Sequence, residues 1–79
     1  MEKGYRGIFS KMGEGLLERF IEDLKEELEK KPKDPELLFK LGVAYSRAGK
    51  VQEAREVYKK LREIDKERAK ELLDAIYGL

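Results

Sequence analysis

The chain has 79 residues and a mass of 9.2 kDa, which is enough for one small domain with a thin hydrophobic core. Lys and Arg number 18 against 17 for Asp and Glu, so the net charge of +1 provides no electrostatic footprint for nucleic acid. Because the chain has neither Cys nor His, thiol nucleophiles, disulfides, imidazole bases and Cys or His metal sites are excluded.

The N-terminal segment, residues 1–15, carries conflicting local signals. Four of the seven glycines lie here, and an interior glycine costs a helix about 1 kcal/mol relative to alanine. Apolar residues nevertheless recur at three- and four-residue steps, as on one helical face, at Tyr5, Ile8, Phe9 and Met12. We expect the segment to be flexible or docked on the rest of the chain. Its basic and apolar residues over 1–12 leave membrane-surface attachment as an alternative, disfavoured because the stretch is short and interrupted by glycine.

The remaining chain, residues 16–79, is expected to form a single all-α domain. Apolar residues recur with helical period, and nothing is typical of a strand. The expected helices span about 16–31, 35–48, 51–64 and 66–77. The expected core consists of Leu24, Leu28, Leu38, Leu41, Tyr45, Ala54, Tyr58, Leu61, Leu72 and Ile76.

Local signals at the helix ends support these boundaries. Pro32 cannot continue the first helix, Asp34 is a preferred N-cap, and Pro35 suits the first position of the second helix. Gly49 is the expected left-handed residue after the second helix, and Asp65 can cap the fourth. The connecting loops are short, so neighbouring helices must pack antiparallel.

The two central helices carry large and small residues in a fixed register. The pattern is Leu38-x-x-Leu41-Gly42-x-x-Tyr45, then Gly49, then Ala54-x-x-x-Tyr58. It resembles the tetratricopeptide repeat, whose 34-residue signature is W-x2-L-G-x2-Y, A-x3-F and a final P. The resemblance covers one full repeat at residues 35–68, with Leu38 in place of Trp, Tyr58 in place of Phe and Lys66 in place of Pro. It implies an antiparallel helical hairpin stack, in which Gly42 lets the two paired helices approach closely.

A shift of 34 residues extends the resemblance in both directions. Residues 16–32 resemble the second helix of a degenerate preceding repeat, and Pro32 restores the signature proline. The last expected helix resembles the solvating helix that closes such arrays. The resemblance therefore implies one full repeat between a degenerate repeat and a closing helix.

Members of this family bind an extended peptide or a helix in a concave groove lined by the first helix of each repeat. The family's groove positions on the central helix fall at Glu36, Phe39, Val43, Ser46 and Arg47. With the 34-residue shift, the implied partner-binding groove contains Tyr5, Phe9, Phe39, Val43, Arg47, Leu73 and Tyr77. An exposed apolar stripe of this kind marks an interaction site. We therefore expect a non-catalytic protein-interaction module or small scaffold, whose partner is another protein or peptide.

Self-association is the main alternative. About three repeats are normally needed for stability, so this short array leaves apolar faces uncovered. The groove could be filled by the chain's own N-terminal segment or by a second copy, and the turn at Gly13-Glu14-Gly15 permits either. We expect a weak homodimer, with Phe39, Val43 and Tyr77 near the contact and Tyr5 and Phe9 contributing.

Other functional classes are disfavoured. The acidic residues alternate with lysines at helical spacing, which is typical of a solvated face, and no glycine-rich loop provides a phosphate cradle. We expect no catalytic residues, no cofactor, no metal and no nucleic-acid partner. No apolar run exceeds three residues, so we expect neither a membrane-spanning helix nor a signal peptide, and a cytoplasmic location. The high charged fraction, 44%, and the dominance of Glu and Lys are typical of thermophilic proteins.

Overall fold

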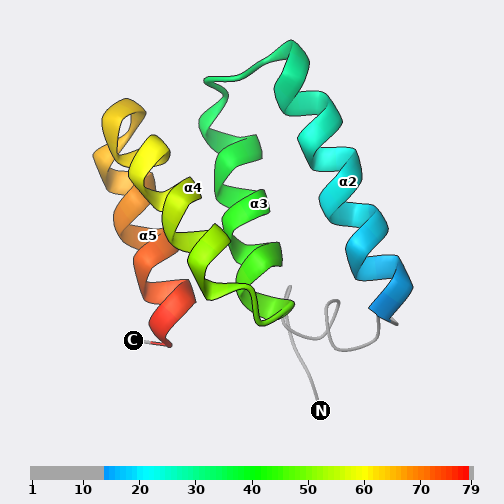
Figure 1. Ribbon diagram of the computed structural model, residues 1–79. Helices are drawn as coiled ribbons and strands as arrows, with labels where there is room; N and C mark the ends of the chain where they lie inside the picture. Colours follow the sequence, from blue (N-terminus) through cyan, green and yellow to red (C-terminus); the bar gives the residue numbers. More distant parts are fainter. Residues whose placement is uncertain (1–13, 79) are drawn as a thin grey trace.

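The computed structural model describes residues 14–78, which contain four α-helices and no strand (Figure 1). The helices are α2 (Glu14–Lys30), α3 (Pro35–Arg47), α4 (Val51–Ile64) and α5 (Lys66–Tyr77). The expected all-α fold is confirmed, and the last two helices have the expected bounds. The start of the first helix differs from the prediction, and two helix ends differ slightly. Helix α2 begins two residues earlier than expected, so Glu14 and Gly15 are helical rather than part of a turn, and α2 and α3 each end one residue earlier.

Consecutive helices run in opposite directions, as the short loops require (Figure 1). Helices α3 and α4 form a hairpin, and α5 packs against both of its members. Helix α2 packs on α3 at the other edge of the stack. Helices α3 and α5 therefore run in the same direction and lie side by side, with their first turns at the same end of the molecule.

The predicted capping residues fix the ends of the helices. One carboxylate oxygen of Asp34 accepts hydrogen bonds from the backbone N–H groups of Glu36 at 2.9 Å and Leu37 at 3.2 Å, which satisfies the first turn of α3. Asp65 accepts from the backbone N–H of Arg68 at 3.0 Å and caps α5 in the same way. Gly49 follows α3 with a φ of 78°, the left-handed conformation that glycine adopts without steric cost.

The core lies where α3 meets its three neighbours. Leu61 and Leu72 are the largest side chains that are fully buried. Within the described range the buried apolar residues are Ile21, Leu24, Leu37, Leu38, Leu41, Val43, Ala44, Ala54, Val57, Leu61, Ala69 and Leu72. The other expected core residues are only half-buried at the edge of this cluster: Leu28, Tyr45, Tyr58 and Ile76.

Gly42 allows a close helix contact, but not the expected one. A Cβ atom at position 42 would lie 2.6 and 2.7 Å from the two methyl carbons of Leu72. The missing side chain therefore makes room for Leu72 of α5, rather than for α4 as expected. Gly42 fixes how the closing helix docks onto the repeat.

Candidate functional site

The first turns of α3 and α5 meet through a single arginine. Arg68 donates from Nη2 to Oε2 of Glu36 on α3, and from Nη1 to Oε1 of Glu71 on its own helix at 2.6 Å. The guanidinium carbon of Arg68 also lies 4.4 Å from the centroid of the Phe39 ring. A guanidinium at this distance over an aromatic face makes a cation–π contact. Arg68 thus covers Phe39 and ties α3 to α5.

The two carboxylates keep Arg68 charged. Its hydrogen bond with Glu36, and then that with Glu71, raises the pKa of Arg68 above its ordinary value. A raised pKa stabilises the fold at every pH below the ordinary value, and this stabilisation disappears only as the pH passes the raised one. Since the ordinary pKa of arginine lies far above neutral pH, the contribution is constant across the neutral range.

We expect Arg68→Gln to lower the free energy of unfolding by about 1 kcal/mol, because ion pairs and a cation–π contact at a partly exposed site are individually weak. The difference from the wild type should stay constant between about pH 6 and pH 9, where arginine does not titrate. It should shrink in high salt, which screens exposed pairs. Urea denaturation of the full chain provides the measurement, with Arg55→Gln on the exposed side of α4 as the matched control. An equal loss in the control would show that the Arg68 contacts contribute nothing.

The groove residues expected from the sequence differ in their exposure. Tyr77 is half exposed, at 50%. Leu73 is half-buried, and Arg47 is exposed at the end of α3. Phe39 is half-buried beneath Arg68.

The burial of Val43 differs from the exposed apolar stripe that was expected. Its side chain is 5% exposed and belongs to the hydrophobic core, so the expectation that it faces an open groove is wrong. Helix α5 lies close to α3 near Val43, because Leu72 packs against the adjacent Gly42. The turn of α3 that contains Val43 therefore has little surface exposed to solvent.

Several expectations fall outside the described residues 14–78. These are the groove residues Tyr5 and Phe9, membrane attachment through residues 1–12, and the conformation of the N-terminal segment. They stay predictions. Within the described range, no group of acidic, His or Cys side chains is placed to hold a metal ion. No helix in that range is both long enough and apolar enough to cross a bilayer.

Sequence reasoning missed Arg68 and Glu71, although a usable signal was present. Glu36 had been identified as a groove position in the first turn of its helix. Arg68 lies in the first turn of α5, 32 residues after Glu36, so opposite charges lie in the first turns of two parallel neighbouring helices. The 34-residue shift places Lys70 opposite Glu36, so repeat register and charge together would have predicted a basic partner on the last helix without identifying Arg68.

Comparison with known families identifies the repeat. A family model described as Tetratricopeptide repeat matches residues 35–74, just over half of the chain. The match begins at the first residue of α3 and covers α4 and all but the last three residues of α5. Comparisons with curated proteins and with solved structures give no match.

Proposed function

The chain belongs to the tetratricopeptide repeat family, and from this premise we propose that it holds a partner's peptide or helix against the exposed side of α3 and α5. Repeats of this family generally mediate protein–protein interactions and are generally non-catalytic. We call the proposed surface the concave face and define it by Glu36, Phe39, Arg47, Leu73 and Tyr77.

The main observation that supports this proposal is the exposure of Tyr77. Leu73 and Tyr77 are four residues apart on α5, so they share one side of the helix. Leu73 is half-buried, whereas half of the Tyr77 side chain faces solvent. Tyrosine is enriched among the residues that dominate binding energy, because it offers a large apolar area and a polar end. An aromatic ring left in solvent beside an apolar neighbour is therefore well suited to a partner's apolar side chain.

Arg68 and its two carboxylate partners, Glu36 and Glu71, make one end of the concave face polar. Glu36 and Glu71 are each about 58% exposed at their side chains, so water or a partner can reach their carboxylates. Phe39 lies beneath Arg68 and is half-buried, so it offers a partner less apolar surface than Tyr77 does. The partner would place apolar side chains near Leu73 and Tyr77 and hydrogen-bonding groups near Arg68.

We expect Tyr77→Ser to weaken binding of a peptide selected on the full chain from a random library by about tenfold, the loss typical of a contributing interface tyrosine. Fluorescence anisotropy of the labelled peptide gives both affinities. Ile64→Ser is the matched control, because Ile64 is an exposed apolar residue at the end of α4, 39% exposed and outside the concave face. Equal weakening by the control would indicate a nonspecific apolar contact. Full affinity in Tyr77→Ser would contradict the proposed face.

A second copy of the chain is the alternative occupant of the concave face. The exposed Tyr77 favours it, but the burial of Val43 removes one of its three principal expected contacts. If this alternative holds, the wild type sediments as a dimer and Tyr77→Ser sediments as a monomer. A wild type that stays monomeric at high concentration excludes it.

A further inference from the structure

A second groove lies on the other side of α3. Two hollows of about 830 and 420 Å³ open between α2 and α4. Both are lined by Lys25, Tyr45 and Glu53, so they form one continuous feature, which we call the α2/α4 groove. Its floor on α3 consists of Leu38, Leu41 and Tyr45, about one helical turn apart. These positions face away from Glu36, Phe39 and Arg47, so the groove is separate from the concave face.

The floor of the groove is apolar and incompletely covered. Leu38, Leu41 and Val57 are buried at its base. Leu28 and Tyr45 were expected in the core, yet both are only half-buried here. Helix α2 packs on α3 without packing extensively on α4, which leaves the upper hollow open to apolar side chains.

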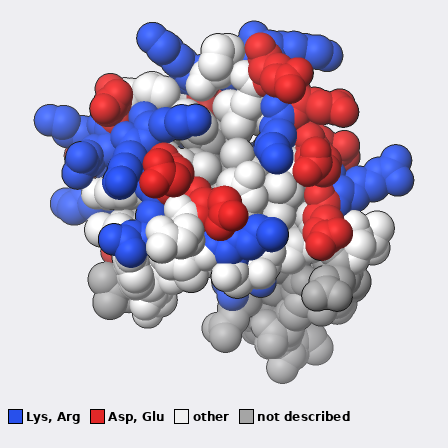
Figure 2. All heavy atoms as spheres, viewed as in Figure 1, with Lys and Arg blue, Asp and Glu red and all other residues white. Residues whose placement is uncertain are grey.

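The lining of the groove has an excess of acidic side chains, which lies on the α2 wall, whereas acids and bases are equal in number on the α4 wall. Seven acidic and four basic side chains line the two hollows, in a chain whose total charge is +1. Figure 2 shows acidic side chains along α2, and both acidic and basic side chains over α4, with an uncharged strip between the two helices. The lining acids are Glu18, Glu22, Asp23, Glu26 and Glu29 of α2 with Glu53 and Glu56 of α4, and the lining bases are Arg19, Lys25, Lys50 and Lys60.

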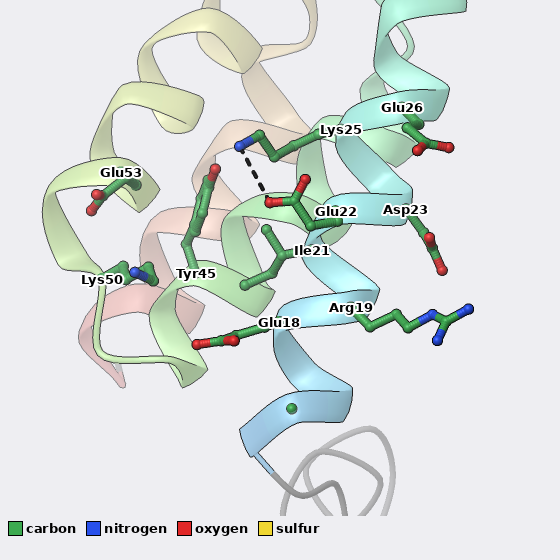
Figure 3. A pocket seen from close by; sticks show the side chains of 11 residues that line it. Glu18, Arg19, Ile21, Glu22, Asp23, Lys25, Glu26, Tyr45, Lys50 and Glu53 are labelled. Atoms are coloured by element: carbon green, nitrogen blue, oxygen red, sulfur yellow. Dashed lines mark ion pairs between the residues drawn. The ribbon is translucent and has the colours of Figure 1, made fainter.

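The close view separates the side chains that face the groove from those that do not. Arg19, Asp23 and Glu26 point to the outer side of α2, whereas Glu18 extends toward α3 and α4 (Figure 3). Lys25 also extends toward α4, but its ammonium group is paired with Glu22 at 3.7 Å. Without the three outward residues, five acids and three bases remain, so the groove keeps its negative charge.

We propose that the α2/α4 groove binds a cationic amphipathic segment of a partner protein. The apolar side chains of the segment would cover Leu28 and Tyr45, the large apolar lining residues that are only half-buried. Its Lys or Arg side chains would meet carboxylates on both walls, such as Glu18 and Glu53. This charge complementarity selects a basic segment over an acidic one, because juxtaposed like charges oppose association. An amphipathic helix lying in an apolar groove is an established mode of peptide recognition.

A synthetic amphipathic peptide of Lys and Leu with a single Trp tests the proposal on the full chain. The chain has no Trp, so all indole fluorescence comes from the peptide. We expect the emission to shift to the blue as the indole enters the apolar groove, and the titration gives the Kd. A peptide of the same charge with Ser in place of Leu should bind at least about tenfold more weakly and show no shift. Equal binding of the two peptides would overturn the proposal, because the floor would then play no part.

Matched charge variants locate the binding site. Replacing Glu18, Glu29 and Glu53 together with Gln removes exposed acids along the groove, and we expect about tenfold weaker binding from three individually modest contributions. Replacing Glu27, Glu63 and Glu67 with Gln makes the same change in net charge outside the groove, and these residues are also exposed. We expect the control to retain wild-type affinity to within about twofold. Equal weakening by both variants would show nonspecific attraction and overturn the proposal.

Two further variants distinguish other occupants and other sites. If Tyr77→Ser abolishes binding of the Lys/Leu peptide, the peptide lies on the concave face and the proposal fails. The first twelve residues of the chain are themselves basic and apolar, with Lys3, Arg6 and Lys11. If replacing these three with Gln tightens peptide binding about tenfold, the chain's own segment competes for the groove and an external partner is not its occupant. Unchanged affinity in both variants supports the proposal.

Discussion

Leu72→Ala is expected to lower the free energy of unfolding by about 2–5 kcal/mol, the range for truncating a large aliphatic side chain in a core. Leu72 is fully buried, and its methyl groups fill the space above Gly42. Truncation would remove this apolar burial and leave a cavity between α3 and α5. Urea denaturation of the full chain, followed by circular dichroism, measures the loss.

This loss is a large share of the total stability. A chain of this length has a free energy of unfolding of about 4–12 kcal/mol. Leu16→Ala is the control, because Leu16 on α2 is 60% exposed and its truncation should change stability by no more than about 0.5 kcal/mol. A loss for Leu72→Ala as small as that of the control would show that α5 is not docked on the repeat through this residue.

Gly42→Leu is expected to destabilise the fold by about 2 kcal/mol or more. Its Cβ alone would come within 2.6 Å of Leu72, whose side chain is fully buried. Overpacking of this kind costs about 1–3 kcal/mol and occasionally more. Leucine has a greater helix propensity than glycine, and this difference offsets about 1 kcal/mol of the loss in stability. Because the Leu72 side chain is already fully buried, we expect the cost to lie at the upper end or beyond.

A double-mutant cycle tests this contact directly. Gly42→Ala should destabilise the wild type, but should be neutral or stabilising in a Leu72→Ala background, where the clash is gone. Gly15→Ala is the control, because a Cβ at that position would meet nothing within 4 Å. It should stabilise α2 by up to about 1 kcal/mol. Additive effects of Gly42→Ala and Leu72→Ala, to within about 0.5 kcal/mol, would contradict the contact.

The parts of the fold that depend on neighbouring residues could be predicted from the sequence. Asp34 and Pro35 determine where α3 begins, and Gly49 determines where it turns, through hydrogen bonds and dihedral angles within a few residues. The repeat register predicted the pairing of α3 with α4, since the loop between them permits only an antiparallel neighbour. Leu61 and Leu72 were expected in the core because their spacing repeats with the helical period.

The features that were missed depend on how α5 and α2 pack against α3. The burial of Val43, the contact of Gly42 with Leu72 and the ion pair between Arg68 and Glu36 all require the relative position of α3 and α5. Tyr45 was expected to fill the space between paired helices, yet it lines a groove because α2 and α4 stand apart. No local pattern encodes these distances between helices.

The central claim is that α3 and α5 form the partner-binding face, and backbone amide NMR of the full chain tests it most directly. The peptide selected from the random library is titrated into the isotope-labelled protein, and the shifted amides are mapped onto the helices. We predict the largest shifts at Phe39, Arg47, Leu73 and Tyr77, with the amides along α2 unmoved. Shifts confined to α2 and α4, with α5 unchanged, would contradict the claim.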